Sequence, residues 1–346
     1  MQTLSRAGKY PWKVDVAVLL LFFNRPEPFR QVFGQVRQAR PSRLFLYQDG
    51  PRQERDLSGI AACREIASHV DWDCEVHRCY LAKNQGCDPS GFRAQKWAFS
   101  LADKVVVLED DSVPSVSFFT FCKEMLDRYE HDTRVMMIAG FNMDEVSTDV
   151  DSDYFFTSFF SVWGWASWRR VADLWDSDYA FLNDAYAMRQ LRALVRSRRL
   201  RPDLLRMFRA HGRSGKEYYE TIFWAAMLLN SGLAIMPAKN MVNNIGLTAD
   251  ASHYTATLKT TPHGLRRIFT MKRFELAGPL RHPRFVAETT AYKERAYRIL
   301  AWGHPWIKAG YSLEELLLNL RHGNFRRIRQ AAVRRIRKLT GRFLYE

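Results

Sequence analysis

The sequence predicts an α/β protein in which a mostly parallel sheet is flanked by helices. Over residues 14–111, apolar runs of strand length alternate with helical patterns, as in successive βαβ units. One of these runs ends abruptly in three consecutive carboxylates, as ligand sites at the edge of such sheets do. Neither G-x-G-x-x-G nor G-x-x-x-x-G-K-[ST] occurs, so the sheet is expected to lack the dinucleotide fingerprint and the P-loop.

The first part of the chain supplies four expected strands and three expected helices. The strands are apolar runs rich in β-branched or aromatic residues, closed by turn signals such as Asp49-Gly50-Pro51. They are expected at residues 14–23, 43–48, 74–79 and 105–108. The helices, marked by apolar residues three and four positions apart, are expected at residues 28–39, 54–69 and 92–101. Residues 86–91 between them are expected to form a loop.

The second part is less regular. Phe118, Phe121, Cys122 and Met125 fall on one helical face, which predicts a helix over residues 117–129. A further helix is expected at 216–230, with strands at 135–139 and 233–236 and extended chain at 240–245. Residues 144–153 and 250–284 are expected to be loop-rich. The aromatic-rich stretch 155–168 contains Trp163, Trp165 and Trp168, which suit either core packing or stacking on a sugar.

Composition and charge bound the class of protein. The chain has 346 residues, 47% of them hydrophobic, which is enough for a large core. The formal net charge is +15, with nine arginines in residues 189–213 and a second basic block in 321–342. Such asymmetry favours a basic face toward phosphates, an anionic membrane or nucleic acid.

Cysteine usage and the N-terminus indicate a compartment. The five cysteines are odd in number and have no C-x-x-C spacing, which argues against a disulfide scaffold and a structural zinc site. No signal-peptide pattern opens the chain, and the longest apolar run, 16–23, is too short to cross a bilayer. The protein is therefore predicted to be cytoplasmic.

The acidic cluster Glu109-Asp110-Asp111 directly follows the apolar run 105–108. Carboxylates packed so closely repel one another and need a cation or hydrogen-bond donors to remain ionised. A divalent metal carrying a diphosphate meets that need, because Mg²⁺ and Mn²⁺ prefer oxygen ligands. The alternative interpretation is a solvated acidic turn after a core strand.

Ordered segments of the chain resemble the GT-A class of nucleotide-sugar glycosyltransferases. The closer resemblance is to a bacterial sugar-nucleotide transferase family labelled hemolytic-protein-like, distantly similar to N-acetylglucosaminyltransferase I. The segments are FFNRPE (22–27), YQDGPR (47–52), VDWDCEV (70–76), KNQGC (83–87), VVVLEDDSVPSVSFFTFC (105–122), WGWASWRR (163–170), GLAIMPAKNMVNNIG (232–246) and DASH (250–253). Residues 87–91 depart from the family's pattern.

The resemblance implies a domain organisation. A GT-A domain is expected over residues 14–255, with a nucleotide-binding half at 14–111 and an acceptor half at 112–255. Residues 256–346 are expected to form a loop-rich and helical extension with a basic tail. The implied donor is a nucleotide-diphosphate sugar, with UDP-sugars favoured, bound together with Mn²⁺ or Mg²⁺.

The resemblance also implies roles for residues around the donor. Asp111 is the expected metal ligand, while Asp110 contacts the ribose or a metal-bound water and Glu109 is structural. Asp49 matches the position that reads the base, although an Asp-Gly turn explains it as well. Three further contacts, each with a plain surface role as the alternative, are implied: Asn24 and Arg25 toward the nucleotide, and Lys96 toward the diphosphate.

Two further implications concern the acceptor side. An acidic residue at the start of the helix expected at 216–230 would take the proton of the acceptor hydroxyl if the reaction inverts the anomeric centre. Glu217 is the first choice and Glu220 the second, against an ordinary glutamate favoured at a helix N-terminus. His253 lies where a loop would bring an imidazole to the metal or diphosphate, although a lone histidine more often does neither.

The C-terminal tail has its own pattern. Apolar residues recur at three- and four-residue intervals from Phe325 to Phe343, with arginines between them, which predicts a basic amphipathic helix. Such a helix binds an anionic membrane surface, here the inner face of the cell membrane, or packs on protein. The predicted function is therefore metal-dependent, inverting transfer of a sugar to a glycan or lipid-linked acceptor in cell-surface polysaccharide synthesis, such as lipopolysaccharide or capsule.

Two rival functions are also compatible with the sequence. One is a non-catalytic membrane-surface protein on the same scaffold. The other is a nucleic-acid binder, which the net charge of +15 suggests. No nucleic-acid-binding motif occurs, and the basic blocks lie outside the motif-bearing region, so no nucleic-acid partner is expected.

Overall fold

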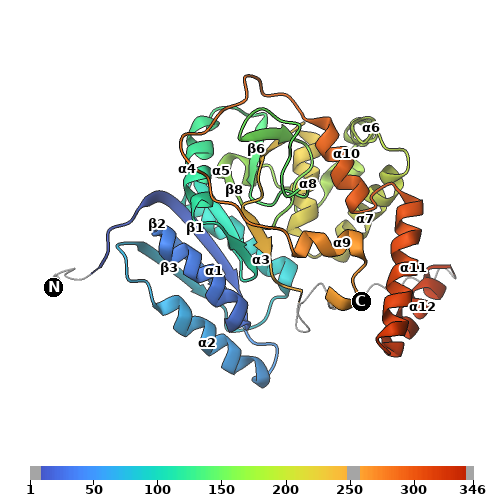
Figure 1. The fold of residues 1–346 in the computed structure, drawn as a ribbon, viewed down its shortest axis with the longest axis horizontal. Helices are drawn as coiled ribbons and strands as arrows, with labels where there is room; N and C mark the ends of the chain where they lie inside the picture. Colours follow the sequence, from blue (N-terminus) through green and yellow to red (C-terminus); the bar gives the residue numbers. More distant parts are fainter. Residues whose placement is uncertain (1–8, 248–257, 340–346) are drawn as a thin grey trace.

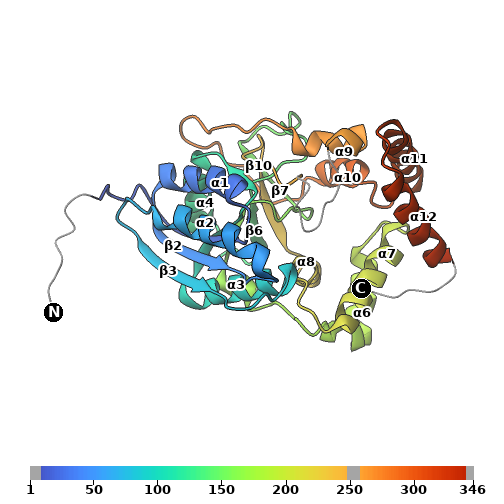
Figure 2. The same cartoon turned by 90° about the horizontal axis from the view of Figure 1, so that it is seen from below.

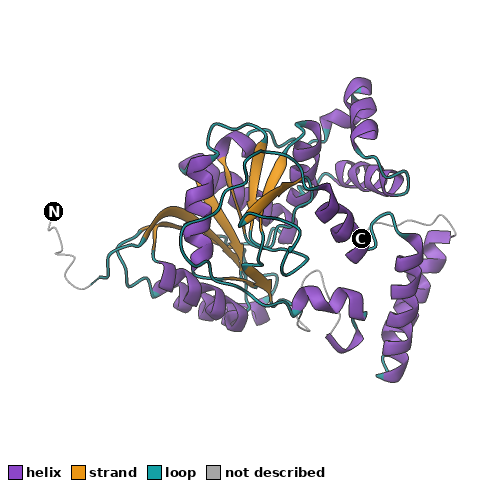
Figure 3. Cartoon of the chain, turned by 45° about the horizontal axis from the view of Figure 1, so that its top comes forward, coloured by secondary structure: helices purple, strands orange, loops and turns teal. Residues whose placement is uncertain are grey.

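The structure is a computed structural model that describes residues 9–247 and 258–339. An eight-stranded mixed sheet lies at its centre, with strand order β3-β2-β1-β4-β8-β6-β9-β7 (Figure 1). The strands are β1 (Val14–Phe22), β2 (Pro41–Gln48), β3 (Glu75–Tyr80), β4 (Lys104–Glu109), β6 (Val135–Ala139), β7 (Tyr154–Thr157), β8 (Trp165–Trp168) and β9 (Leu233–Pro237). Helices pack around this central sheet (Figure 3). The predicted α/β class with a mostly parallel sheet is therefore confirmed.

The parallel half positions the candidate site. β2 and β4 flank β1 and both run parallel to it, with Leu21 opposite Tyr47 on one side and Glu109 on the other. The carboxyl-terminal ends of β1, β2 and β4 therefore lie side by side at one edge of the sheet. Helices α1 (Pro26–Ala39) and α2 (Leu57–Ser68) pack together on one face of this half, and α3 (Cys87–Leu101) on the other (Figure 2).

The start of α3 differs from the sequence-based expectation. Residues 87–91 are helical and not part of a loop. Pro89 is compatible with this because it lies in the first turn, where a backbone N–H has no partner within the helix.

The second half of the sheet contains the antiparallel pairs. β8, which the sequence analysis did not predict, runs antiparallel between β4 and β6. Trp165 and Trp168 are buried, and the Trp168 indole N–H donates to the Leu126 carbonyl at 3.0 Å. These two tryptophans therefore pack in the core, which was one of the two roles expected from the sequence. A two-stranded sheet joins β5 (Ser112–Pro114) to β10 (Val242–Asn244).

Further helices surround this half and form the C-terminal part. They are α4 (Ser117–Arg128), α5 (Arg169–Ala172), α6 (Ala185–Leu194), α7 (Leu200–Ser214), α8 (Tyr219–Leu229), α9 (His263–Arg266), α10 (Thr290–Ile299), α11 (Pro305–Arg321) and α12 (Phe325–Leu339). The predicted tail helix is confirmed in α12, while α6, α7, α10 and α11 were not foreseen as individual helices. α11 and α12 contact each other and stand apart from the sheet (Figures 1 and 2). In the described part of the chain, no helix combines the length and apolarity needed to span a bilayer.

Arg170 holds the turn before β6 in place. Its guanidinium donates to the carbonyls of Glu130 (3.0 Å) and Val135 (2.8 Å), and it stacks over the Trp168 ring at 4.4 Å. We expect Arg170→Ala to lower the free energy of unfolding by about 2–3 kcal/mol, because buried carbonyls lose their donors. Urea unfolding checks this, with exposed Arg209→Ala as control; equal stability of the two variants would contradict it.

Candidate functional site

A cavity of about 260 Å³ opens at the carboxyl ends of β1, β2 and β4. The loops after these strands supply Arg25, Asp49 and Asp110, and the first turn of α3 supplies Cys87 and Ser90. Tyr219, the first residue of α8, closes one side. The carboxyl edge of a doubly wound sheet is where such folds bind ligands.

Arg25 is the central cation of the acidic cluster. Its guanidinium donates to both oxygens of Asp110 and to Asp111 Oδ2 at 2.8 Å. Asp110 also accepts the backbone N–H of Phe23 at 3.4 Å. Both aspartates are buried. Arg25 thus lies at the expected edge of the sheet, although it binds carboxylates of its own chain here.

Residues from β10 and the segment after it complete the surroundings of Asp111. Asn244 Nδ2 donates to Asp111 Oδ1 at 2.9 Å, and the Ile245 N–H donates to the Asp111 carbonyl at 2.9 Å. A Cβ placed on Gly246 would lie 2.1 Å from Asp111 Oδ2, so only glycine leaves that oxygen its space. Asn244 was not foreseen, although it belongs to the quoted segment 232–246.

Glu109 is bound from the opposite side. Tyr219, which was also not foreseen, donates its hydroxyl to Glu109 Oε1 at 2.6 Å. Burial, with the neighbouring charge of Asp111, raises the pKa of Glu109 to about 8. Burial likewise raises the pKa of Asp110 to about 6, with Arg25 opposing the rise. At neutral pH this raised pKa favours the protonated form of Glu109, so the carboxylates that share the charge of Arg25 are those of Asp110 and Asp111.

Asp49 lies in the wall of the cavity, where it organises the loop before α3. Its carboxylate accepts the backbone N–H groups of Gly50 (2.8 Å), Gln85 (2.9 Å) and Gly86 (3.1 Å). The side chain of Asn84 donates to it as well, at 2.9 Å. Asp49 is therefore at the predicted place, and much of its acceptor capacity is used by the protein.

Asn24 lines the cavity, but its side-chain amide forms a hydrogen bond within the protein. Its Nδ2 donates to Asp56 Oδ1 at 2.8 Å, and Arg52 Nη2 donates to the same oxygen at 2.8 Å. The Arg52 guanidinium lies over the Phe23 ring at 4.8 Å and also lines the cavity. Arg52 was not foreseen as a site residue, although the segment 47–52 contains it.

Lys96 is not brought to the cavity. It lies on α3, five and six positions beyond the cavity-lining Gly91 and Ser90, and its Nζ donates to the Ala172 carbonyl at 3.1 Å. The expected diphosphate contact of Lys96 has no counterpart in this arrangement, because the lysine lies on another face of the helix.

The two glutamates proposed as the base lie beside the cavity, at the start of α8. Glu217 Oε1 accepts from Arg93 Nη2 at 3.4 Å. Glu220 is exposed, and its charge contributes to the raised pKa of Glu109. Neither lines the cavity itself. The expected contribution of His253 falls outside the described residues.

The oxygen donors present suit a hard divalent cation. Two carboxylates, those of Asp110 and Asp111, share the single guanidinium of Arg25, and Asp111 Oδ2 lies in the space left by Gly246. Mn²⁺ and Mg²⁺ take such ligands with water and phosphate oxygens. Within residues 9–247 and 258–339, no group of three or more His, Cys, Asp or Glu is arranged to hold a metal alone. A metal here would therefore draw its remaining ligands from elsewhere.

No protein-family model matches this chain, and no match emerges from a search of curated proteins. Its function is therefore inferred from the fold, from the geometry of the cavity and from the resemblance of its sequence segments.

The raised pKa of Glu109 predicts a pH-dependent stability. Between about pH 5 and pH 8, the folded protein binds more protons than the unfolded chain, so metal-free stability should fall as pH rises. Glu109→Gln should flatten this slope and add on the order of 1 kcal/mol at pH 8. Urea unfolding in the presence of a chelator measures both, with exposed Glu54→Gln as control; an unchanged slope in Glu109→Gln would contradict the prediction.

Proposed function

We propose that the protein is a metal-dependent glycosyltransferase of the GT-A type that uses a nucleotide-diphosphate sugar. One observation carries the proposal: the carboxylates of Asp110 and Asp111, directly after β4, share one guanidinium beside a cavity of about 260 Å³. This excess of negative charge favours a divalent cation, and the cavity at the strand ends suits a nucleotide. The resemblance of segments 22–27, 47–52 and 105–122 to glycosyltransferases supports the same conclusion.

Asp111 and Asp110 are the residues that would hold Mn²⁺ or Mg²⁺. When bound, the metal would supply charge stabilisation to the leaving nucleoside diphosphate. Arg25 is the cation of the chain nearest to this place, and it keeps the two aspartates together. Asn244 orients Asp111 from the far side. Tyr219 keeps Glu109 aligned, because burial raises the pKa of Tyr219 and maintains its hydroxyl as a donor.

The remaining wall of the cavity would receive the nucleoside. Tyr47 and Asp49 at the end of β2 line it, opposite Phe23 and Arg52. An aromatic ring and a carboxylate are suited to stacking and hydrogen bonding with a base such as uracil. UDP-sugars are therefore the favoured donors in the proposal.

Glu217 and Glu220 are the residues that would accept the proton of the acceptor hydroxyl. Both lie within two residues of Tyr219, which lines the donor cavity. Glu217 is partly exposed and paired with Arg93. A carboxylate beside the donor cavity supports an inverting reaction, in which the base and the leaving group lie on opposite sides of the anomeric carbon.

Asp111→Asn tests the metal assignment. With wild type, UDP and Mn²⁺ together should raise the melting temperature, because ligands that bind only the folded state stabilise it. Asp111→Asn should lose most of this rise, because the neutral amide binds a divalent cation less tightly than the carboxylate does. For the same reason, the rate of sugar-nucleotide turnover should fall at least about tenfold. Exposed Asp178→Asn is the matched control. An unchanged Mn²⁺-dependent shift in Asp111→Asn would refute the assignment.

A specific observation favours membrane attachment as a second property. Four large apolar side chains of α11 are exposed: Trp306 by 84%, Leu313 by 59%, Leu317 by 56% and Leu320 by 46%. At 100° per residue they form one stripe along the helix. The adjoining α12 has arginines at 326, 327 and 329. We propose that this pair of helices binds the anionic inner face of the cell membrane, which places the enzyme in the cytoplasm.

Removal of the stripe tests the attachment. Leu313→Ser with Leu317→Ser should weaken binding to phosphatidylglycerol vesicles about tenfold or more, because each buried leucine contributes roughly 1.5–3 kcal/mol. Vesicle co-sedimentation measures this, with Leu174→Ser, an exposed leucine on another segment, as control. Equal binding by both variants, or self-association through the stripe without vesicle binding, would contradict the proposal.

A further inference from the structure

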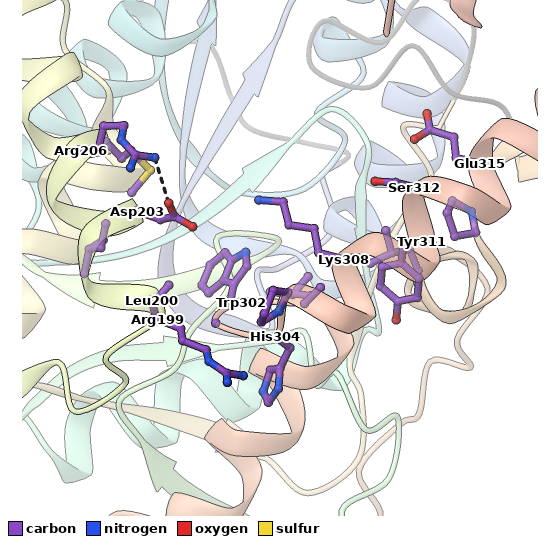
Figure 4. Close-up of a pocket in the computed structure, with 18 of the residues that line it drawn as sticks. Arg199, Leu200, Asp203, Arg206, Trp302, His304, Lys308, Tyr311, Ser312 and Glu315 are labelled. Carbon is purple, nitrogen blue, oxygen red and sulfur yellow. Dashed lines mark hydrogen bonds and ion pairs between the residues drawn. The ribbon is translucent and has the colours of Figure 1, made fainter. Parts of the chain in front are cut away.

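A second and larger cavity, of about 1070 Å³, lies between α7 and α11 (Figure 4). Two tryptophans form an aromatic wall: Trp224 of α8 and Trp302, before α11, stack with ring centroids 5.1 Å apart and planes at 19°. Trp302 is only partly buried and lies among the cavity-lining side chains of Figure 4. The rings of Tyr297 and Phe159 also lie against Trp302, with centroids 5.8 and 6.0 Å away, and the part of the indole that stays exposed suits the C–H face of a sugar ring.

Basic side chains surround the aromatic wall. Arg199, directly before α7, and Lys308, on α11, both line the cavity and are exposed. Among the described residues neither forms an ion pair, whereas Arg206 in the same wall is paired with Asp203 at 3.0 Å. His304 lies close to Arg199, and Glu315 lies at the opposite end of the cavity (Figure 4). Two cations are thus available for anionic groups, Lys308 on one side of Trp302 and Arg199 on the other (Figure 4).

The backbone adds to this charge. α7 begins at Leu200 and α11 at Pro305, and both residues line the cavity. The two starts lie close together, since a Cβ on Gly303 would be 3.5 Å from the Leu200 nitrogen. Helix N-termini carry partial positive charge, which reinforces Arg199 and Lys308.

We propose that this cavity binds a phosphorylated saccharide. The aromatic wall would take the apolar face of a sugar ring, and a phosphate at either end of the saccharide would meet Lys308 on one side of Trp302 or Arg199 on the other (Figure 4). The volume falls at the upper end of ligand sites, so more than one sugar unit fits the space. The ligand class is an anionic glycan, distinct from the nucleotide expected at the carboxyl edge of the sheet.

The position of the cavity connects it with the donor site. Trp224 is five residues beyond Tyr219 on α8, about 7.5 Å along the helix axis. His211, which lines the larger cavity, stacks on Tyr218 at 3.8 Å. The two cavities therefore flank the start of α8, where Glu217 and Glu220 lie. The bound saccharide would be the acceptor, a role that rests on the proposed glycosyltransferase function, whereas the binding itself does not.

Direct binding tests the proposal in metal-free buffer, in which the donor cavity lacks its proposed cation. The probes are glucose 1-phosphate, glucose and inorganic phosphate, measured by tryptophan fluorescence and calorimetry. Glucose 1-phosphate should bind most tightly. Arg199→Ala with Lys308→Ala should weaken it at least tenfold, while neighbouring Arg198→Ala should leave it unchanged. Absence of binding, equal binding by the double variant, or equal affinity for inorganic phosphate would overturn the proposal.

The same variants separate this inference from the function on which the acceptor role rests. The Arg199/Lys308 double variant should keep the UDP–Mn²⁺ thermal shift of wild type, and Asp111→Asn should keep its affinity for glucose 1-phosphate. Absence of glucose 1-phosphate binding in wild type with an intact UDP–Mn²⁺ shift overturns the second site alone. The reverse result overturns the donor site alone.

Discussion

The imbalance of charge at the end of β4 is the constraint on which the site depends. A strand buried in the sheet delivers Glu109, Asp110 and Asp111 to one edge, where Arg25 is the cation that binds two of them. Like charges this close remain together only if donors and counter-ions surround them. The loop after β1, the segment after β10 and the start of α8 all meet this demand, and together they shape the cavity.

These surrounding residues come from distant parts of the chain. Tyr219 contacts Glu109 across 110 sequence positions, and Asn244 contacts Asp111 across 133. Each is a neutral donor, which orients an acidic side chain without adding positive charge. The fold therefore sets the geometry of the cluster, and Arg25 remains the cation bound to it. This combination is what a site for a metal and a diphosphate requires, and it is the physical basis of the proposed activity.

Much of the first half of the fold could be predicted because its strands are continuous apolar runs and its helices have clear periodicity. Prediction failed at the start of α3: residues 86–91 were expected to form a loop, yet the helix begins at Cys87 and contains Pro89 in its first turn. The acidic cluster was predictable because its members are adjacent in sequence. The contact of Tyr219 with Glu109 was not predictable, because only the folded chain brings the two residues together. Lys96 was assigned to the site wrongly, because the sequence does not show which face of α3 points toward the cavity.

Under the two proposals of a membrane-bound stripe and a saccharide-binding cavity, the two faces of α11 have a geometric consequence for the choice of acceptor. Lys308 and Ser312 face the larger cavity, while Trp306 and Leu313 lie on the exposed stripe. A helix with its side chains is about 10 Å thick. With the stripe on a bilayer, the helix acts as a spacer of fixed width. It would select acceptors by how far their sugars project from the lipid, so that short membrane-proximal glycans reach the cavity and longer ones pass beyond it.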